Sequence, residues 1–133
     1  MPFDGLSSPN LLALEKLDGA RELLSDPRRW CKGSLVNEFG QMCTLAALRR
    51  VGAEDELKPL ILMVARDVTG RTFRSIERFN DHHRTTHATV LQVLDRTRAE
   101  LVSGRYHAGV PTGYLHRWRS ACRRLVTATV LRA

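Results

Sequence analysis

Acidic residues are missing from the last part of this chain, since none follows Glu100. Residues 105–133 instead carry six arginines and a net charge of +6, whereas residues 1–104 carry 15 basic and 14 acidic side chains. Nearly all of the formal net charge of +7 therefore falls on this C-terminal extension. Such an asymmetry favours an anionic partner at that end, either nucleic acid or another polyanion, an anionic lipid surface, or an acidic protein.

Cysteine and long apolar runs are also scarce. The three cysteines (Cys31, Cys43 and Cys122) are odd in number and form no Cys-x-x-Cys pair. This usage argues against a secreted disulfide scaffold and favours a reducing cytoplasm. The longest apolar run, Leu60 to Ala65, is far shorter than the roughly 20 residues of a spanning helix. Because the N-terminus also lacks a signal-peptide pattern, we expect a cytoplasmic protein without a transmembrane segment.

Aromatic residues make up only 6% of the 133 residues, so leucine, valine, isoleucine and alanine must fill most of the core. Apolar spacing predicts six helices. They run over 9–24, over 43–51, from near Glu56 or Leu57 to 67, over a short segment that ends at Asn80-Asp81, from Thr85 or Thr86 to 102, and from 114 onward. Proline at position 59 is expected in the first turn of its helix. An Asn/Gly turn between two short runs predicts a hairpin.

The fold class we predict is mostly α, a compact bundle of about five or six helices with one small β-hairpin near residues 33–43. Residues 1–104 would form the helical domain with its hairpin. Residues 105–133 would form a basic C-terminal extension, made of a linker and an amphipathic helix, within the same single domain.

No Walker or Rossmann phosphate loop and no convincing pair of acid–base carboxylates occurs, so no catalytic residue is assigned and no metal or small-molecule cofactor is expected. Two alternatives involving thiols stay open. Cys31 and Cys43 could join His82 or His83 in a metal site, although zinc ligands usually come in closer pairs. Cys31 could also act as a nucleophile with a histidine base. The favoured interpretation is two buried, inert thiols beside Trp30.

The densest polar cluster lies before the helix that Thr85 or Thr86 caps. Its members predict either a polar pocket that faces a ligand or a structural connection in which Asn and Asp bond nearby backbone amides. They are Arg78, Asn80, Asp81, His82 and His83.

The extension has three interpretations. Its arginines could bind a polyanion, with Tyr106, Tyr114 or Trp118 stacking on bases; these are Arg105, Arg117, Arg119, Arg123 and Arg124. Its apolar stripe of Leu115, Trp118 and Leu125 could pack on this domain, bind a partner protein or form a homo-oligomer. The same helix could lie on a membrane surface. From these we predict a non-catalytic polyanion-binding module, with a protein-interaction or self-association domain as the alternative.

Residues 14–101 resemble a family of small, mostly actinobacterial domains of unknown function. The segments that carry the resemblance are Trp30–Ser34, Cys43–Ala47, Ile76–Asp81, Thr85–Ala88 and Val90–Leu91. The chain departs from the family where Thr44 and Ala46 replace Ala and Gly, and the basic extension lies outside the match. The resemblance implies a helical domain and no particular activity.

Overall fold

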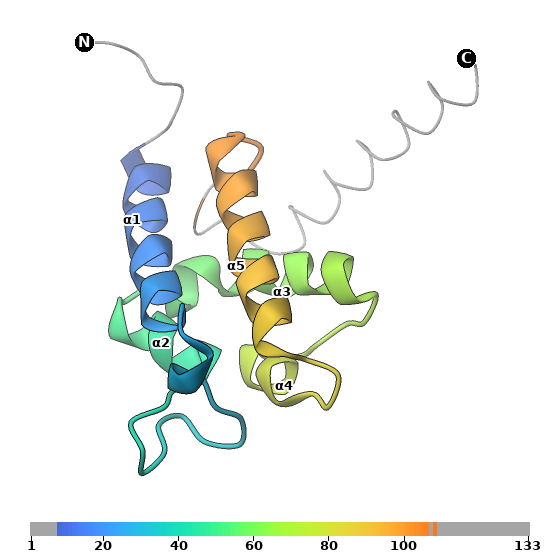
Figure 1. Ribbon diagram of the computed structural model, residues 1–133. Coiled ribbons are helices and arrows are strands. Elements are labelled where there is room, and N and C mark those ends of the chain that lie inside the picture. The colour runs from blue at the N-terminus through green and yellow to red at the C-terminus, as the bar shows by residue number, and fades with distance from the viewer. Residues whose placement is uncertain (1–7, 107, 109–133) are drawn as a thin grey trace.

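The fold of this protein is helical, as a computed structural model that describes residues 8–106 and 108 shows (Figure 1). Five α-helices and one short 3-10 helix lie within these residues. In chain order they are α1 (Ser8–Leu23), η1 (Pro27–Arg29), α2 (Thr44–Arg50), α3 (Glu54–Thr69), α4 (Ile76–Asp81) and α5 (His87–Val102). The prediction of a mostly α-helical chain is confirmed for this part of it.

Helices α1 and α5 lie side by side and run in opposite directions, and α3 crosses behind α5 (Figure 1). The helices pack around one hydrophobic core, built mostly from aliphatic side chains as the composition requires. Its largest fully buried members include Leu17, Leu24, Leu48, Leu57, Ile61, Phe79 and Leu94. Full burial of one such side chain contributes about 1.5–3 kcal/mol, so this core is the main source of stability.

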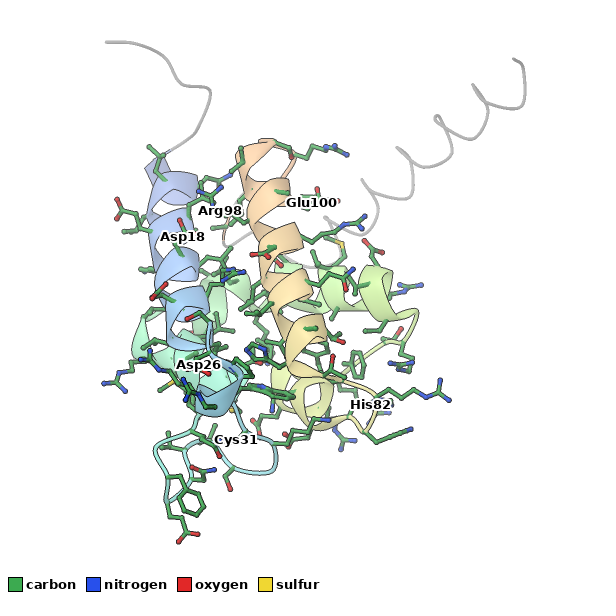
Figure 2. The ribbon with its side chains drawn as sticks, viewed as in Figure 1. Asp18, Asp26, Cys31, His82, Arg98 and Glu100 are labelled. Carbon is green, nitrogen blue, oxygen red and sulfur yellow. The ribbon has the colours of Figure 1, made fainter. Side chains whose placement is uncertain are left out.

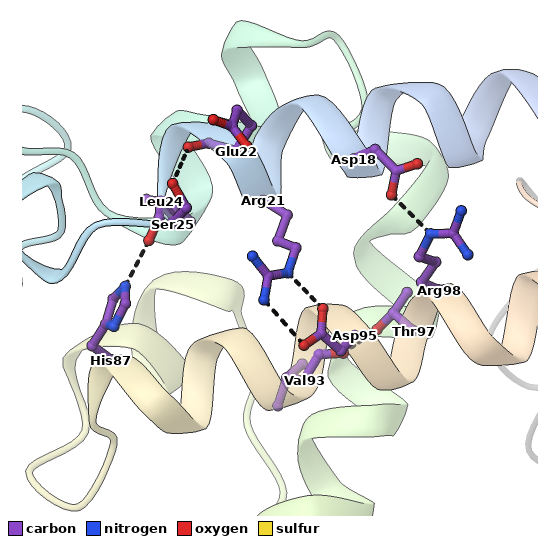
Figure 3. A network of polar contacts seen from close by, with 10 residues as sticks. All are labelled: Asp18, Arg21, Glu22, Leu24, Ser25, His87, Val93, Asp95, Thr97 and Arg98. Atoms are coloured by element: carbon purple, nitrogen blue, oxygen red, sulfur yellow. Dashed lines mark hydrogen bonds and ion pairs between the residues drawn. The ribbon is translucent and has the colours of Figure 1, made fainter.

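Two ion pairs join the outer surfaces of α1 and α5 (Figure 3). Arg21 Nε lies 2.6 Å from Asp95 Oδ1, and Arg98 Nε lies 3.0 Å from Asp18 Oδ1. All four side chains are at least one-third exposed, so each pair contributes about 0–1 kcal/mol. These pairs therefore orient two helices that the core already holds together.

The ends of the helices follow the capping signals of the sequence. Ser75 and Thr86 begin α4 and α5 with side-chain oxygens that accept backbone amides, and Thr86 forms a reciprocal pair with Thr89. Gly70 ends α3 with a φ of 74°, in the left-handed region that glycine adopts without strain. The short helix that ends at Asp81 and the longer one after Thr86 thus lie where the sequence predicts them.

The predicted start of α3 was wrong. We expected the helix to begin near Glu56 or Leu57 because proline is best tolerated in a first turn, but α3 begins at Glu54 and contains Pro59. The backbone amide that proline lacks would have bonded the carbonyl of Asp55, four residues earlier. Asp55 is exposed, so water can satisfy that carbonyl and the proline does not break the helix.

The predicted β-hairpin over residues 33–43 is not present as strands. Met42 forms one isolated parallel bridge with Trp30 and one isolated antiparallel bridge with Val36, and no sheet forms among residues 8–106 and 108. The amide of Asn37 donates to the Gln41 carbonyl, as in a hairpin. The amide of Gln41, however, donates to the side-chain oxygen of Asn37, which removes the reciprocal bond of a ladder.

The start of the basic extension contacts the helical body. Tyr106 is buried, its carbonyl accepts from Asn10 Nδ2 at 2.7 Å, and the amide of Ala108 donates to Asn10 Oδ1. Asn10 is itself 1% exposed and also donates to the carbonyl of Leu101 at the end of α5. The chain is therefore fixed to α1 up to this point. None of the helices in the described ranges is long and apolar enough to span a membrane.

Candidate functional site

Asn80 organises the polar end of the molecule. Its side chain is fully buried at the end of α4 and makes five hydrogen bonds. Its Oδ1 accepts from Trp30 Nε1 at 2.7 Å and from both the amide and the hydroxyl of Thr44. Its Nδ2 donates to the carbonyl of Cys31 and to Asp81 Oδ1. One side chain thus joins α4, the start of α2 and the 30–34 loop.

Asp81 and His82 extend this connection to the same loop. Asp81 Oδ1 accepts the amide of Gly33 at 3.0 Å, and the carbonyl of His82 accepts Lys32 Nζ at 2.7 Å. The sequence led us to expect that Asn80 and Asp81 would bond nearby amides. Their partners instead lie 36 to 50 residues away, apart from the bond between the two neighbours themselves. The polar cluster is therefore a tertiary junction, and it fixes the surface beside it.

That surface contains an open pocket of about 640 Å³ between the end of α3 and the end of α4. Three arginines line it, together with one carboxylate and two rings. The lining residues are Arg71, Thr72, Phe73, Arg74, Arg78, Asp81 and His82. Figure 2 shows His82 at the turn that follows α4, on the opposite side of this end from Cys31.

The charge of the pocket is mostly positive. Arg71, Arg74 and Arg78 form no ion pair with any carboxylate of residues 8–106 and 108. The Nε of Arg71 is shielded from water and has no hydrogen-bond acceptor within that same part of the chain. Asp81, the only acid that the described part of the chain places on the lining, already accepts two hydrogen bonds through its Oδ1. The pocket therefore offers guanidinium donors that no carboxylate of the described residues satisfies.

His82 responds to this environment. Partial desolvation lowers the pKa of its imidazole below 6.5, and the positive charges of Arg71, His83, Arg84 and Lys32 lower it further. Its Nδ1 accepts the amide of Arg84 at 3.1 Å, so the neutral ring carries its proton on Nε2. Both causes favour the neutral form of this imidazole.

Both described thiols are buried and reduced. Cys31 Sγ donates to the Ser34 carbonyl, and Cys43 Sγ accepts the amide of Ala46 as the cap of α2. Desolvation by burial is the main cause that raises the pKa of each thiol, so both are protonated near neutral pH. No histidine of the described segments hydrogen-bonds either sulfur, which gives no support to a nucleophilic Cys31.

A metal site over these cysteines gains no support either. Among the described residues, no three His, Cys, Asp or Glu side chains gather where they could hold a metal ion. Of the histidines near this end, His87 bonds the carbonyl of Leu24 at 2.6 Å (Figure 3) and packs at 5.9 Å from Trp30. His82 and His83 stack on each other instead.

The structure brings three residues of the predicted polar pocket, Arg78, Asp81 and His82, onto the lining of one pocket. Asn80 lies beneath it, and His83 stacks on His82 at its edge. Sequence reasoning missed Arg71 and Arg74, although the run 70–74 between two helices holds two arginines, a ring and no acid. Of the predicted polyanion-binding arginines, Arg105 is exposed at the end of the described chain.

The remaining predicted residues of the extension lie outside the described ranges. They are Arg117, Arg119, Arg123 and Arg124, with Leu115, Trp118 and Leu125 of the apolar stripe. Their assignment stays a prediction.

Comparison with known proteins gives a family but no activity. No curated protein and no solved structure matches the chain. The sequence pattern of a family of unknown function, DUF6197, matches residues 8–100, which include all five α-helices in whole or in large part. The pocket and its buried junction lie inside this matched range, whereas the basic extension lies beyond it. The chain therefore belongs to the family of unknown function DUF6197.

Proposed function

We propose that this chain is a non-catalytic binding module for a polyanion, and specifically for nucleic acid. The observation that carries the proposal is the pocket beside α4, where Arg71, Arg74 and Arg78 surround one opening without carboxylate partners in the described ranges. Guanidinium groups bind phosphate oxygens through paired N–H donors, and their charge remains at any physiological pH. Arg74 and Arg78 are exposed, so their guanidinium groups are open to such a ligand.

The basic extension supports the same function from the sequence. Six arginines and no acid over residues 105–133 provide an attraction to phosphate that requires no precise geometry. Arg105 is exposed directly after α5, and Arg117, Arg119, Arg123 and Arg124 complete the proposed surface. The pocket and the extension would bind different phosphates of one long ligand.

Fluorescence anisotropy with a labelled nucleic-acid fragment tests the proposal. Each phosphate contact contributes about 0.7 to the slope of log K against log salt for a single strand, and about 0.9 for a duplex. The double variant Arg74→Ala/Arg78→Ala should therefore bind more weakly and reduce that slope by about 1.4 for a single strand and about 1.8 for a duplex. Arg96→Ala is the matched control, because Arg96 is exposed on α5, forms no ion pair with residues 8–106 and 108, and does not line the pocket.

A second series separates the extension from the pocket. A triple variant should lower both the affinity and the salt slope further, because it removes three arginines of the extension. Its substitutions are Arg117→Ala, Arg123→Ala and Arg124→Ala. Undetectable binding at low salt, or binding that does not depend on salt, would show that the chain is not a polyanion-binding module.

A second candidate function is protein interaction or self-association. Leu35, Val36 and Phe39 are 43%, 58% and 78% exposed on the 33–42 loop, and apolar patches that face water mark protein–protein interaction sites. In this alternative Leu115, Trp118 and Leu125 of the extension would add a second apolar contact. Analytical ultracentrifugation decides it, since a chain that stays monomeric at high concentration does not self-associate.

A further inference from the structure

Four rings form a continuous series from the core to the surface at the edge of the arginine pocket. Phe79 is fully buried, and its ring meets Phe73 edge to face at a centroid distance of 5.4 Å. Phe73 meets His82 at 5.6 Å, again edge to face, and His82 stacks on His83 at 4.4 Å with an interplanar angle of 28°. His83 is exposed, so the series ends in a ring that reaches solvent.

The buried end of this series of rings, at Phe79, is held in the core, and the exposed end, at His83, can contact a ligand. Phe79 belongs to the hydrophobic core and Phe73 packs against it, so their positions are fixed by burial. His82 is further held by the hydrogen bond from the Arg84 amide to its Nδ1. His83 therefore presents a flat ring on a fixed support, which limits the entropy lost when another ring stacks on it.

The stacking face and the phosphate-binding groups adjoin each other. Phe73 and His82 line the same pocket as Arg71, Arg74 and Arg78. Proteins that bind single strands combine these two elements, a positive groove for the backbone and rings on which unpaired bases stack. A duplex hides the faces of its bases, so a stacking ring gains nothing from it.

Resting on the proposed function, we infer that this surface selects single-stranded over double-stranded nucleic acid, with phosphates on the pocket arginines and a base on His83. The arginines provide attraction to either form. The ring of His83 provides the preference for unpaired bases.

The test measures the affinity of the full-length chain for a labelled single strand and for the duplex of the same sequence. A strand of about twelve nucleotides is within the range of lengths that single-strand-binding domains cover. The single strand should bind more tightly than the duplex. His83→Ala should weaken the binding of the single strand by about tenfold, the typical loss for one base–aromatic stack, and should leave the binding of the duplex unchanged. His83→Trp should strengthen single-strand binding, which a fold defect would not do. Gln92→Ala is the control and should leave both affinities unchanged, because it shortens an exposed side chain of α5 that does not line the pocket.

The outcomes separate this inference from the function on which it rests. Equal binding of both forms, with no effect of His83→Ala, overturns the preference and leaves polyanion binding intact. A phosphopeptide of the same charge that binds as tightly as the single strand also overturns it. Failure to bind either nucleic acid at low salt overturns both proposals.

Discussion

Replacement of Asn80 by alanine tests whether the buried junction holds the polar end of this protein together. The change removes five hydrogen bonds and leaves at least three groups without partners, namely the amide and hydroxyl of Thr44 and the carbonyl of Cys31. Thr44 is fully buried, so water cannot replace the lost acceptor there. Each buried group left unsatisfied costs about 1–3 kcal/mol, so the three together predict a loss of about 3–9 kcal/mol in the free energy of unfolding.

The control is Asn37→Ala, which also removes several hydrogen bonds of an asparagine. Asn37 accepts from the amides of Phe39 and Gln41 and donates to Gln41 Oε1, but it lies on a loop that water can reach. Its loss should cost about 1 kcal/mol. Urea unfolding followed by circular dichroism measures both variants. If Asn80→Ala loses no more than Asn37→Ala, the junction does not stabilise the fold and the pocket above it is not fixed by it.

Three further predictions concern single groups. Burial raises the pKa of Cys31 and of Cys43, so iodoacetamide at neutral pH should alkylate both slowly in the folded chain and rapidly in urea. Mass spectrometry measures the alkylation of each cysteine, and fast alkylation of Cys31 in the folded chain would revive its role as a nucleophile. An NMR titration should place the pKa of His82 below 6.5, because desolvation lowers it most and the charge of Arg71 lowers it further. Arg71→Gln should raise this pKa, and an unchanged pKa in that variant would show that Arg71 is not a cause. Since this pKa is lower in the folded than in the unfolded chain, its contribution to stability is present above pH 6.5 and is lost on acidification. Gly70→Ala should cost about 1–2 kcal/mol in urea unfolding, because a φ of 74° strains any residue with a Cβ, and an unchanged midpoint would contradict that conformation.

The parts of the fold that sequence predicts well are those with local causes. Ser75 and Thr86 begin helices because their own hydroxyls accept amides three residues later, a fact of spacing alone. Pro59 misled us because the cost of a proline inside a helix depends on whether the freed carbonyl reaches water. The 33–43 segment misled us because Asn37 competes for the amide that a hairpin needs.

The candidate site could be predicted only in part for a related reason. The polar residues 78–83 stand out by composition, but their partners lie in the 30–34 loop and at Thr44, and no local pattern relates segments so distant. Arg71 and Arg74 join them only because the chain turns back after Gly70. The pocket is therefore a product of tertiary packing, whereas its charge is readable from the sequence.

The length of α5 has a consequence for the ligand. This helix begins next to the pocket and ends just before Arg105, and its 16 residues span about 24 Å at 1.5 Å per residue. Phosphates of one strand in a duplex advance by about 3.4 Å per nucleotide along the helix axis, so a duplex shorter than about seven base pairs, aligned with α5, can touch either the pocket or Arg105, but not both. A longer one engages the second group at high effective concentration once the first is bound. Affinity should therefore rise abruptly with oligonucleotide length, at a step whose position the helix sets.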